Sequence, residues 1–306
     1  MQAIARMRLL ALALVSLITV AGCVGSAATG SDGGVPADLG DSAGGDDLAS
    51  TSPADLAEGP ADMSRTYSTD PTTFMGSPRC AALHAQLCDD FEASALDTKT
   101  WTANGDVSLD TSQFARGKQA LHLHIVGQNW ATITESKTFP EAGNHFFGRL
   151  FFRATAIPTT NPAAAHWTLV AGAGNSTPEI REGGISGKWG TGTDNRVDGG
   201  TGDWTNADND PAGNPKPVPS NTWACIEWEY DGGNNETRFW WDGVEHPSMH
   251  TTSTMHGGDQ TVPYLLPTFT NVKIGWMLYQ NPVSPTTFDI WIDEIAIDSA
   301  RIGCNN

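Results

Sequence analysis

The 306-residue chain is poor in basic residues, in cysteine and in long apolar runs. Its 17 Lys and Arg face 35 acidic residues, and the net charge of -18 argues against nucleic acid as a partner. The five cysteines form no C-x-x-C pair, so no zinc or redox motif is indicated. No helical period persists over ten residues, and the chain lacks a serine nucleophile elbow and a phosphate-binding loop.

Residues 1–22 predict an export signal peptide. Two arginines precede an apolar run from Leu9 to Val20, which is too short for a lasting membrane span. The ending V-A-G-C resembles the lipobox of bacterial lipoproteins, in which the cysteine, here Cys23, becomes the lipid-modified first residue. The alternative is an ordinary cleaved signal with a chance cysteine. The resemblance implies an exported lipoprotein, and Val24 favours the outer membrane or cell surface.

Residues 23–78 predict an acidic low-complexity tether. After the first cysteine the segment carries nine acidic residues and one basic residue, with one Tyr and one Phe. A degenerate unit recurs as PADL, PADL and PADM. Such a composition buries too little apolar surface to offset chain entropy, so we expect a spacer rather than a solenoid.

Residues 79–306 hold all eleven tryptophans and are long enough for one domain with its own core. Runs of alternating apolar and polar residues predict strands, and a stretch rich in Gly, Asn, Asp and Pro at about 190–221 predicts a long surface loop. The expected strands lie at 119–127, 148–157, 166–174, 223–246 (a hairpin), 271–280 and within 288–304. We therefore predict an all-β, two-sheet antiparallel sandwich.

The closing segment, FDIWIDEIAIDSARIGC, predicts a strand that is apolar on both sides. Alternate residues from Phe288 to Ile292 share one side, and those from Trp291 to Ile297 share the other. Asp293 then falls in an apolar row. A buried carboxylate is costly unless its charge is compensated, and a bound cation is one solution.

The four cysteines after the signal are expected to form two disulfides, because an exported chain meets an oxidising environment. Three pairings are possible, and spacing alone excludes none. We favour Cys80–Cys88, which closes a short local loop, with Cys225–Cys304, which would join two strands.

Five segments resemble, in this order, the concanavalin A-like (lectin/glucanase) jelly roll. They are CDDFE (88–92), ARGKQALHL (115–123), W-x-C-x-E-W (223–228), IGW…Y (274–279) and W-x-D-E…RIGC (291–304). More narrowly, they resemble the glucuronan lyases of polysaccharide lyase family 20 and the fungal secreted cellulose-induced proteins. The resemblance implies a jelly-roll β-sandwich with a polysaccharide partner. We expect the protein to act as a monomer.

In that family a calcium ion commonly ties the first strand to the last. Carried over, Glu92 and Asp293 would be side-chain ligands, and the segment from Ser112 to Arg116 would add a hydroxyl and carbonyl oxygens. Calcium prefers such hard oxygen ligands. The alternative is that Asp293 only accepts hydrogen bonds from the backbone or from arginine.

The resemblance also implies a site for β-elimination of a uronic-acid polysaccharide. This reaction needs a group that neutralises the sugar carboxylate, a base and an acid. The matching positions are His166 as base or carboxylate partner, Arg181 as neutraliser and Tyr279 as acid, with Gln280 and Lys188 as helpers.

This chain departs from the family pattern at one position. Glu182 stands between Arg181 and Gly-Gly, where the family has an apolar residue, and we expect it to compete for the guanidinium. The negative charge of the domain also disfavours a polyanionic substrate unless the site is locally basic.

A second hypothesis is a non-catalytic carbohydrate-binding module. Trp167, Trp189 and Trp276, with Trp204, would present flat faces to sugar rings. The alternative is that most tryptophans fill the core.

A third hypothesis is a laminarinase-like glycoside hydrolase. Glu227 and Glu229 share a strand face about 7 Å apart, which suits paired carboxylates. The hydrolase pattern E-x-D-x-x-E is absent, which favours a place for both residues on the solvent face of the hairpin.

His122 and His124 also share a strand face. Two histidines can bind a transition metal when a third ligand is present. The sequence shows no third ligand, which favours exposed strand residues.

Overall fold

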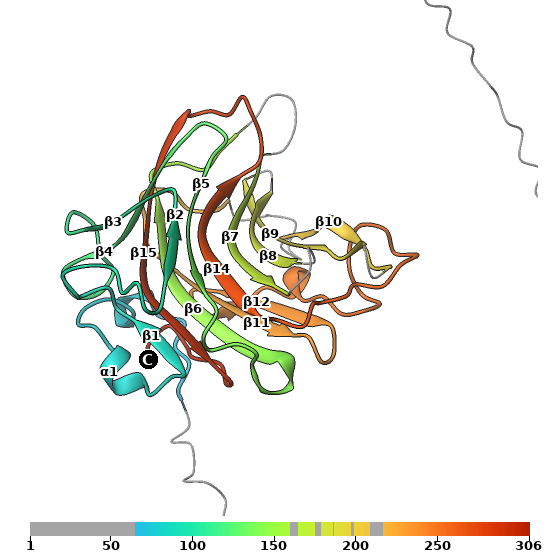
Figure 1. Ribbon diagram of the computed structural model, residues 1–306, viewed down its shortest axis with the longest axis horizontal. Coiled ribbons are helices and arrows are strands. Elements are labelled where there is room, and N and C mark those ends of the chain that lie inside the picture. The colour runs from blue at the N-terminus through green and yellow to red at the C-terminus, as the bar shows by residue number, and fades with distance from the viewer. Residues whose placement is uncertain (1–64, 160–164, 175–178, 186, 197–198, 209–216) are drawn as a thin grey trace, which may run out of the picture. The chain divides into compact units, whose positions relative to one another are not determined.

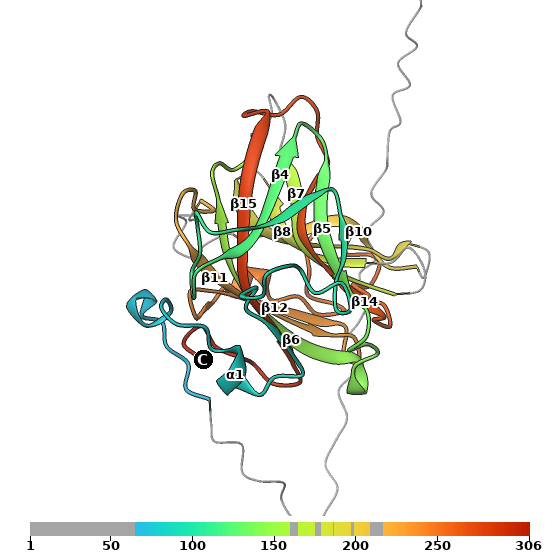
Figure 2. The same ribbon diagram turned by 60° about the vertical axis from the view of Figure 1, so that its left-hand side comes forward.

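The computed structural model describes residues 65–306, apart from 160–164, 175–178, 186, 197–198 and 209–216. The export signal, Cys23 and the tether up to residue 64 lie outside the described residues. Two antiparallel sheets face each other, as Figures 1 and 2 show, and the predicted all-β jelly-roll sandwich is confirmed. In the described part, no helix is long and apolar enough to cross a membrane.

The first sheet brings the first and last strands of the domain together. Along the sheet the strands are β13 (Val244–Glu245), β12 (Glu236–Trp241), β11 (Ala224–Asp231), β6 (His145–Ala154), β15 (Thr287–Asp298), β4 (Ala120–Val126) and β3 (Asp106–Asp110). β1 (Leu87–Asp89) pairs with the later half of β15, beyond the end of β4. The predicted adjacency of the first and last strands is therefore confirmed.

The second sheet carries the candidate site. Its order is β10 (Gly202–Ala207), β9 (Lys188–Asp194), β8 (Glu179–Ile185), β7 (His166–Ala173), β14 (Asn271–Leu278), β5 (Trp130–Glu135) and β2 (Thr102–Asn104). The predicted surface loop at 190–221 is wrong over β9 and β10. In β9 glycines alternate with Trp189, Thr191 and Thr193, which are buried and face the core. The glycines make this alternation hard to recognise in the sequence.

Helical structure among the described residues is brief. It comprises α1 (Cys80–Leu83) and the 3-10 turns η1 (Pro71–Thr73), η2 (Ala142–Asn144) and η4 (Pro247–Met249).

Aromatic stacking fills the space between the sheets. The rings of Trp167 and Trp276 lie 4.2 Å apart at 16°, and Phe152 is stacked against both. Gly184 lies directly beneath the Trp167 ring, where an added Cβ would come within 2.0 Å of it. A side chain at this position would therefore displace the stack.

β15 contains a bulge that corrects the interpretation of the closing strand. The register with β6 shifts between Asp293 and Ala296, and Glu294 has a φ of 44° in the left-handed region. As a result Ile295 and Ile297 join the earlier apolar residues of the strand in the core. The prediction of two apolar rows is wrong, because the two acidic residues at the bulge both face away from the core.

Segments from both ends of the domain cover this face of β15. Phe74 is fully buried beside Phe151 and Cys304, and the Arg65 guanidinium donates to the carbonyl oxygens of Ala300 and Arg301. The sequence predicts residues 65–78 as part of the tether, whereas these contacts place them against the domain, ahead of the predicted boundary at residue 79. The buried Phe74 ring and the Arg65 hydrogen bonds hold this Pro-containing segment against the domain.

Both favoured disulfides are present. Cys80–Cys88 ties α1 to β1 with a Cα–Cα distance of 5.3 Å, and Cys225–Cys304 ties β11 to the end of the chain at 5.9 Å. Of the three possible pairings, the preferred one is therefore confirmed.

Glu182 lies in the core between the sheets. Neither carboxylate oxygen meets a hydrogen-bond partner in normal geometry among the described residues. The hydroxyls of Tyr230 and Tyr264 belong to the same region, where Tyr264 contacts Thr191 at 3.2 Å. Burial raises the pKa of Glu182 well above its usual value, although the Thr191 hydroxyl opposes this shift. The side chain is therefore expected to be protonated and neutral.

We predict that Glu182→Gln stabilises the protein at pH 8 but not at pH 4.5. A raised pKa in the folded state contributes stability that is fully present below the unfolded pKa and lost as pH rises. Each unit by which the pKa is raised corresponds to about 1.4 kcal/mol. Urea unfolding of both proteins at several pH values measures the effect, and parallel pH profiles for the two proteins would contradict it.

Candidate functional site

The candidate catalytic residues lie on the face of the second sheet that is turned away from the first sheet, here called the outer face. Along β7 and β8, Trp167 and Ile180 point into the core, so the alternating positions His166 and Arg181 point outward. Figure 1 shows β14, β7 and β8 bowed in the same sense, with this face on the inside of the bend. The predicted residues therefore share one concave surface.

Arg181 and Tyr279 meet on this face. The guanidinium carbon of Arg181 lies 5.6 Å from the centre of the Tyr279 ring, which is a cation–π contact. The Tyr279 hydroxyl and the Thr168 hydroxyl are 2.9 Å apart. Tyr279 follows β14 directly, and its backbone N–H donates to the His166 carbonyl oxygen at 3.3 Å. Register thus places the histidine and the tyrosine opposite each other on neighbouring strands.

His166 and Gln280 are joined at the start of β7. The backbone N–H of His166 donates to the Gln280 side-chain oxygen, and the Gln128 side chain donates to the Tyr279 carbonyl oxygen. Gln280 therefore holds the strand end in place. The His166 ring lies 5.8 Å from the half-buried Trp204 ring of β10.

The floor of the site between these side chains is made of glycine. Gly183 of β8 pairs with Gly190 of β9, and Gly192 pairs with Arg181. By strand alternation these glycines occupy outward positions, and all three are buried, so no bulky side chain projects from the sheet there. Lys188 is in the same cross-strand row as His166, through Ile185. This register places Lys188 at the edge of the glycine floor.

Carboxylates already contact the Arg181 guanidinium. Its Nε donates to Glu179 at 2.7 Å, and Nη2 lies 3.6 Å from Asp194. Burial alone would lower the pKa of Arg181, but Glu179, Tyr279 and Asp194 raise it above its usual value. The expected competition from Glu182 is wrong, because adjacent residues of a strand point to opposite faces and Glu182 points into the core.

Basic residues also gather on this face. Lys273 of β14 is paired with Ala171, which in turn pairs with Arg181, so all three positions lie in one outward row. With Lys188, this gives three basic side chains against Glu179 and Asp194. The outer face is thus less acidic than the chain as a whole.

The prediction that Trp167, Trp189 and Trp276 bind sugar is corrected by their burial. All three have no exposed surface and stack within the core between the sheets. Their positions on β7, β9 and β14 alternate with the outward residues, and each strand places one Trp beneath the site. They therefore support the site without touching a ligand.

Sequence reasoning missed two residues at the site. Thr168 contacts Tyr279, and it could have been found from the alternation that places it outward with His166. Trp130 is 45% exposed and makes an edge contact with the Tyr279 ring at 5.9 Å. The exposure of one Trp among eleven has no signal in the sequence, because it depends on which face of β5 is covered.

The carboxylates of the hydrolase hypothesis lie on the first sheet, on the side away from the core. Glu227 is buried and accepts hydrogen bonds from Arg301 at 2.8 Å and from the Gly303 N–H at 2.7 Å. Glu229 contacts His145 at 2.8 Å. The expected place of Glu227 on the solvent face is wrong, because the end of the chain covers it, and neither residue belongs to the outer face of the second sheet.

Two of the residues predicted to bind calcium accept hydrogen bonds from one loop, residues 115–119. Asp293 Oδ2 accepts the backbone N–H groups of Ala115 and Arg116 at 2.8 and 2.9 Å, whereas its buried Oδ1 has no partner among the described residues. Glu92 Oε1 accepts the N–H groups of Lys118 and Gln119. Burial, opposed by the backbone hydrogen bonds, raises the pKa of Asp293 to about 7.

These observations fit a cation only in part. A buried carboxylate oxygen without a partner suits a metal ligand, and Glu92 holds the other end of the same short loop. Ser112 does not fit, because its backbone N–H and its hydroxyl both donate to Asp110.

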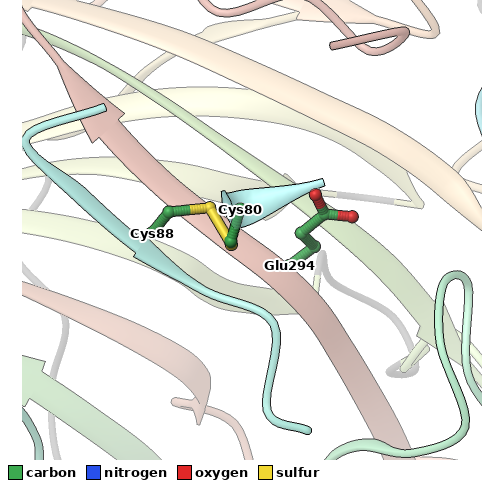
Figure 3. A group of neighbouring side chains, drawn as sticks. All are labelled: Cys80, Cys88 and Glu294. Atoms are coloured by element: carbon green, nitrogen blue, oxygen red, sulfur yellow. A yellow bond between two sulfur atoms is a disulfide. The ribbon is translucent and has the colours of Figure 1, made fainter. Parts of the chain in front are cut away.

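Two other groups of potential metal ligands contain disulfides. Figure 3 shows one of them, the Cys80–Cys88 bridge beside Glu294, and the second is Cys225 and Cys304 with Glu227. Because the sulfurs are bonded to each other, each group offers a single carboxylate. Neither is a metal site while its disulfide is intact.

Comparison with known structures reveals proteins with a similar fold. The solved structure titled "Cellulose induced protein, Cip1" superimposes with a TM-score of 0.53 at 20% identity, covering 71% of this chain and 99% of that chain. A botulinum neurotoxin serotype D/C binding domain (TM-score 0.46, 12% identity, 72% and 50% covered) and a sialidase (0.42, 11%, 71% and 19%) are more distant. These likenesses concern the fold.

No curated protein matches the chain. A family profile does match, over residues 90–300, and its description is Polysacc_lyase-like, Cip1-like, core domain. This range includes every strand of both sheets except β1, and every residue of the candidate site. The chain therefore belongs to the polysaccharide lyase-like family with the Cip1-like core domain, whose function is related to carbohydrate.

Proposed function

We propose that the domain binds a uronic-acid polysaccharide on the outer face of the second sheet and cleaves it by β-elimination. The observation that carries this proposal is the contact between the Arg181 guanidinium and the Tyr279 ring, opposite His166. A cation, a phenol and an imidazole can supply the carboxylate neutraliser, the acid and the base that the reaction requires. The glycines beside them leave this part of the outer face without bulky side chains.

The proposed step removes the proton on the carbon next to the uronate carboxylate. The electron pair of that C–H bond forms a carbon–carbon double bond, and the bond to the glycosidic oxygen on the next carbon breaks. The departing oxygen takes a proton from the acid. One product therefore has an unsaturated uronate end and the other a new hydroxyl.

Arg181 is assigned to the sugar carboxylate because its planar fork matches a carboxylate. Glu179 and Asp194 hold the guanidinium from one side, so the substrate carboxylate would share it with them. Tyr279 is assigned as the acid, with its hydroxyl oriented by Thr168. His166 is assigned as base or second carboxylate partner, and Lys188 and Lys273 supply local positive charge.

We predict that Tyr279→Phe slows cleavage strongly but preserves folding. General acid–base groups typically contribute about 10²–10⁴-fold to the rate. The full chain is incubated with glucuronan, alginate and a neutral glucan, and the ultraviolet absorbance of unsaturated uronate ends is followed. Absorbance is expected with a uronic-acid polymer only, and its rate should fall by this factor in the variant.

Tyr67→Phe is the matched control. The Tyr67 hydroxyl donates a hydrogen bond to the carbonyl oxygen of Arg301, and neither residue belongs to the second sheet. This variant should cleave at the wild-type rate. Equal activity in Tyr279→Phe and wild type would overturn the role of Tyr279, and absence of absorbance with every uronate polymer would overturn cleavage.

A second candidate function is glycan binding without cleavage. It is favoured by the exposed Trp130 beside Tyr279 and by the carboxylates that already occupy Arg181. Sugar rings pack against exposed aromatic faces. Retention of a polysaccharide that is lost in Trp130→Ala, with no absorbance from any substrate, would select this function.

We also propose that a calcium ion stabilises the loop at 115–119, between Asp293 and Glu92. The unpartnered Asp293 Oδ1 supports this, and loop carbonyl groups would complete an oxygen shell. The role would be structural, since the loop lies against β15 of the first sheet.

We predict that chelation lowers the melting temperature of the wild type and leaves Asp293→Asn unchanged. A ligand present at 100 times its Kd stabilises the folded state by about 2.7 kcal/mol. In chelator at pH 8, the variant should be no less stable than wild type, because it removes a buried charge. Asp97→Asn, an exposed site, is the control. A wild-type melting temperature that is the same with and without chelator would contradict the proposal.

We further propose that Cys23 anchors the chain by a lipid at the outer membrane or cell surface. The lipobox-like V-A-G-C and the acidic spacer after it support this. The domain would then meet polysaccharide outside the cell.

A further inference from the structure

A cluster of histidine and aspartate lies on the first sheet, on the side that faces away from the core and apart from the candidate polysaccharide site. His122 and His124 are two residues apart on β4 and share one face. On β15, Asp289 is paired with His124, and Trp291 is paired with His122. The third ligand that the sequence did not show is therefore supplied by the neighbouring strand.

Both imidazoles converge on one carboxylate oxygen. His122 Nε2 lies 3.0 Å from Asp289 Oδ1, and His124 Nδ1 lies 2.9 Å from the same atom. Ligand atoms of a tetrahedral zinc ion, at 2.0–2.2 Å from the metal, stand roughly 3.4 Å apart. The three ligand atoms do not all lie within 4.8 Å of one another in this arrangement, so both imidazole rings must turn before one ion can contact all three.

The backbone around these three residues is fixed before any ion binds. Asp289 donates its N–H to the Thr155 hydroxyl at 3.1 Å, and its carbonyl accepts the Thr155 N–H at 2.9 Å. His124 is also paired with Asp106 of β3, so an acidic residue occupies the position on each side of it. Strand pairing thus sets the spacing of the ligands, which lowers the entropy that binding must offset.

An ion can reach the cluster from solvent. The side chains of His122, His124 and Asp289 are 20, 39 and 34% exposed. Two imidazoles and a carboxylate favour zinc, nickel or copper over calcium, which prefers oxygen alone. Asp106 or a water molecule would take the fourth position.

We propose that His122, His124 and Asp289 form a binding site for a first-row divalent transition ion, with zinc as the resident metal. The ion would clip β4 to β15 on the first sheet. The proposal is independent of the polysaccharide function and of the calcium proposal, because it shares no residue with either.

Zinc titration of the full chain by calorimetry tests this, with excess calcium present to saturate sites made of oxygen alone. One zinc ion should bind per chain. His124→Gln and Asp289→Asn should each weaken binding by about tenfold or more. His250→Gln is the matched control, since His250 contacts the single carboxylate of Glu236 at 2.8 Å and has no second histidine beside it. It should bind zinc as the wild type does.

Trp291 provides a second measurement that locates the ion. Its ring is stacked on the His122 ring at 5.0 Å and 21°, so copper bound at His122 should quench part of the tryptophan fluorescence. Zinc should reverse this quenching, and His122→Gln should abolish it while the melting temperature in chelator stays near that of wild type. Zinc affinity that is equal in all variants, or no zinc binding by the wild type, would overturn the site.

Discussion

The buried carboxylate of Glu294 is the interaction on which the first sheet depends. Its oxygens lie 2.8 Å from Arg116 and 3.3 Å from Arg149, and all three side chains are fully buried. The two guanidiniums also donate to carbonyl oxygens of residues 303–306 and pack against the Phe151 ring. Losing one partner of such a pair leaves a buried charge and costs roughly 3–5 kcal/mol. The bulge in β15 places the Glu294 carboxylate next to these two guanidiniums. It also turns Ile295 and Ile297 toward the core.

The alternation of inward and outward side chains along each strand also positions the candidate site. On β7, β8 and β9 the inward side chains pack in the core. The Trp167 and Trp189 rings leave no room for a side chain at position 184, which is glycine. The outward positions do not contribute to the stacked aromatic core, although Gly183 among them must stay glycine because a Cβ there would come within 2.1 Å of the Trp167 carbonyl oxygen. His166, Arg181 and Lys188 occupy other outward positions, with glycine between. A surface for polysaccharide therefore follows from a core that is stabilised by stacked aromatic rings on the other side of the same strands.

The sequence predicts the sandwich, the two disulfides and the adjacency of the first and last strands, since period-two alternation and ordered motifs are local signals. It fails where a local signal misleads. The alternation in the closing strand continues through Asp293, but the bulge reverses it, and a bulge has no reliable local signature. Glycine in β9 suggests a loop until burial of Thr191 and Thr193 is known. The contacts of Arg181 with Glu179 and Asp194, and of Asp289 with two histidines, depend on register between strands that are distant in sequence.

Two buried carboxylates show why environment matters more than burial itself. Asp293 and Glu182 each have oxygen atoms without hydrogen-bond partners in the described part of the chain, and burial raises the pKa of both. Asp293 lies under a loop whose backbone N–H groups favour the ionised form, so its pKa is near 7 and a cation can compensate the remaining charge. Glu182 lies among aromatic rings and hydroxyls between the sheets, where an ion would have no oxygen shell. Protonation is the compensation available there, and it keeps the core beneath Arg181 neutral, so the guanidinium is paired only with carboxylates on its own face.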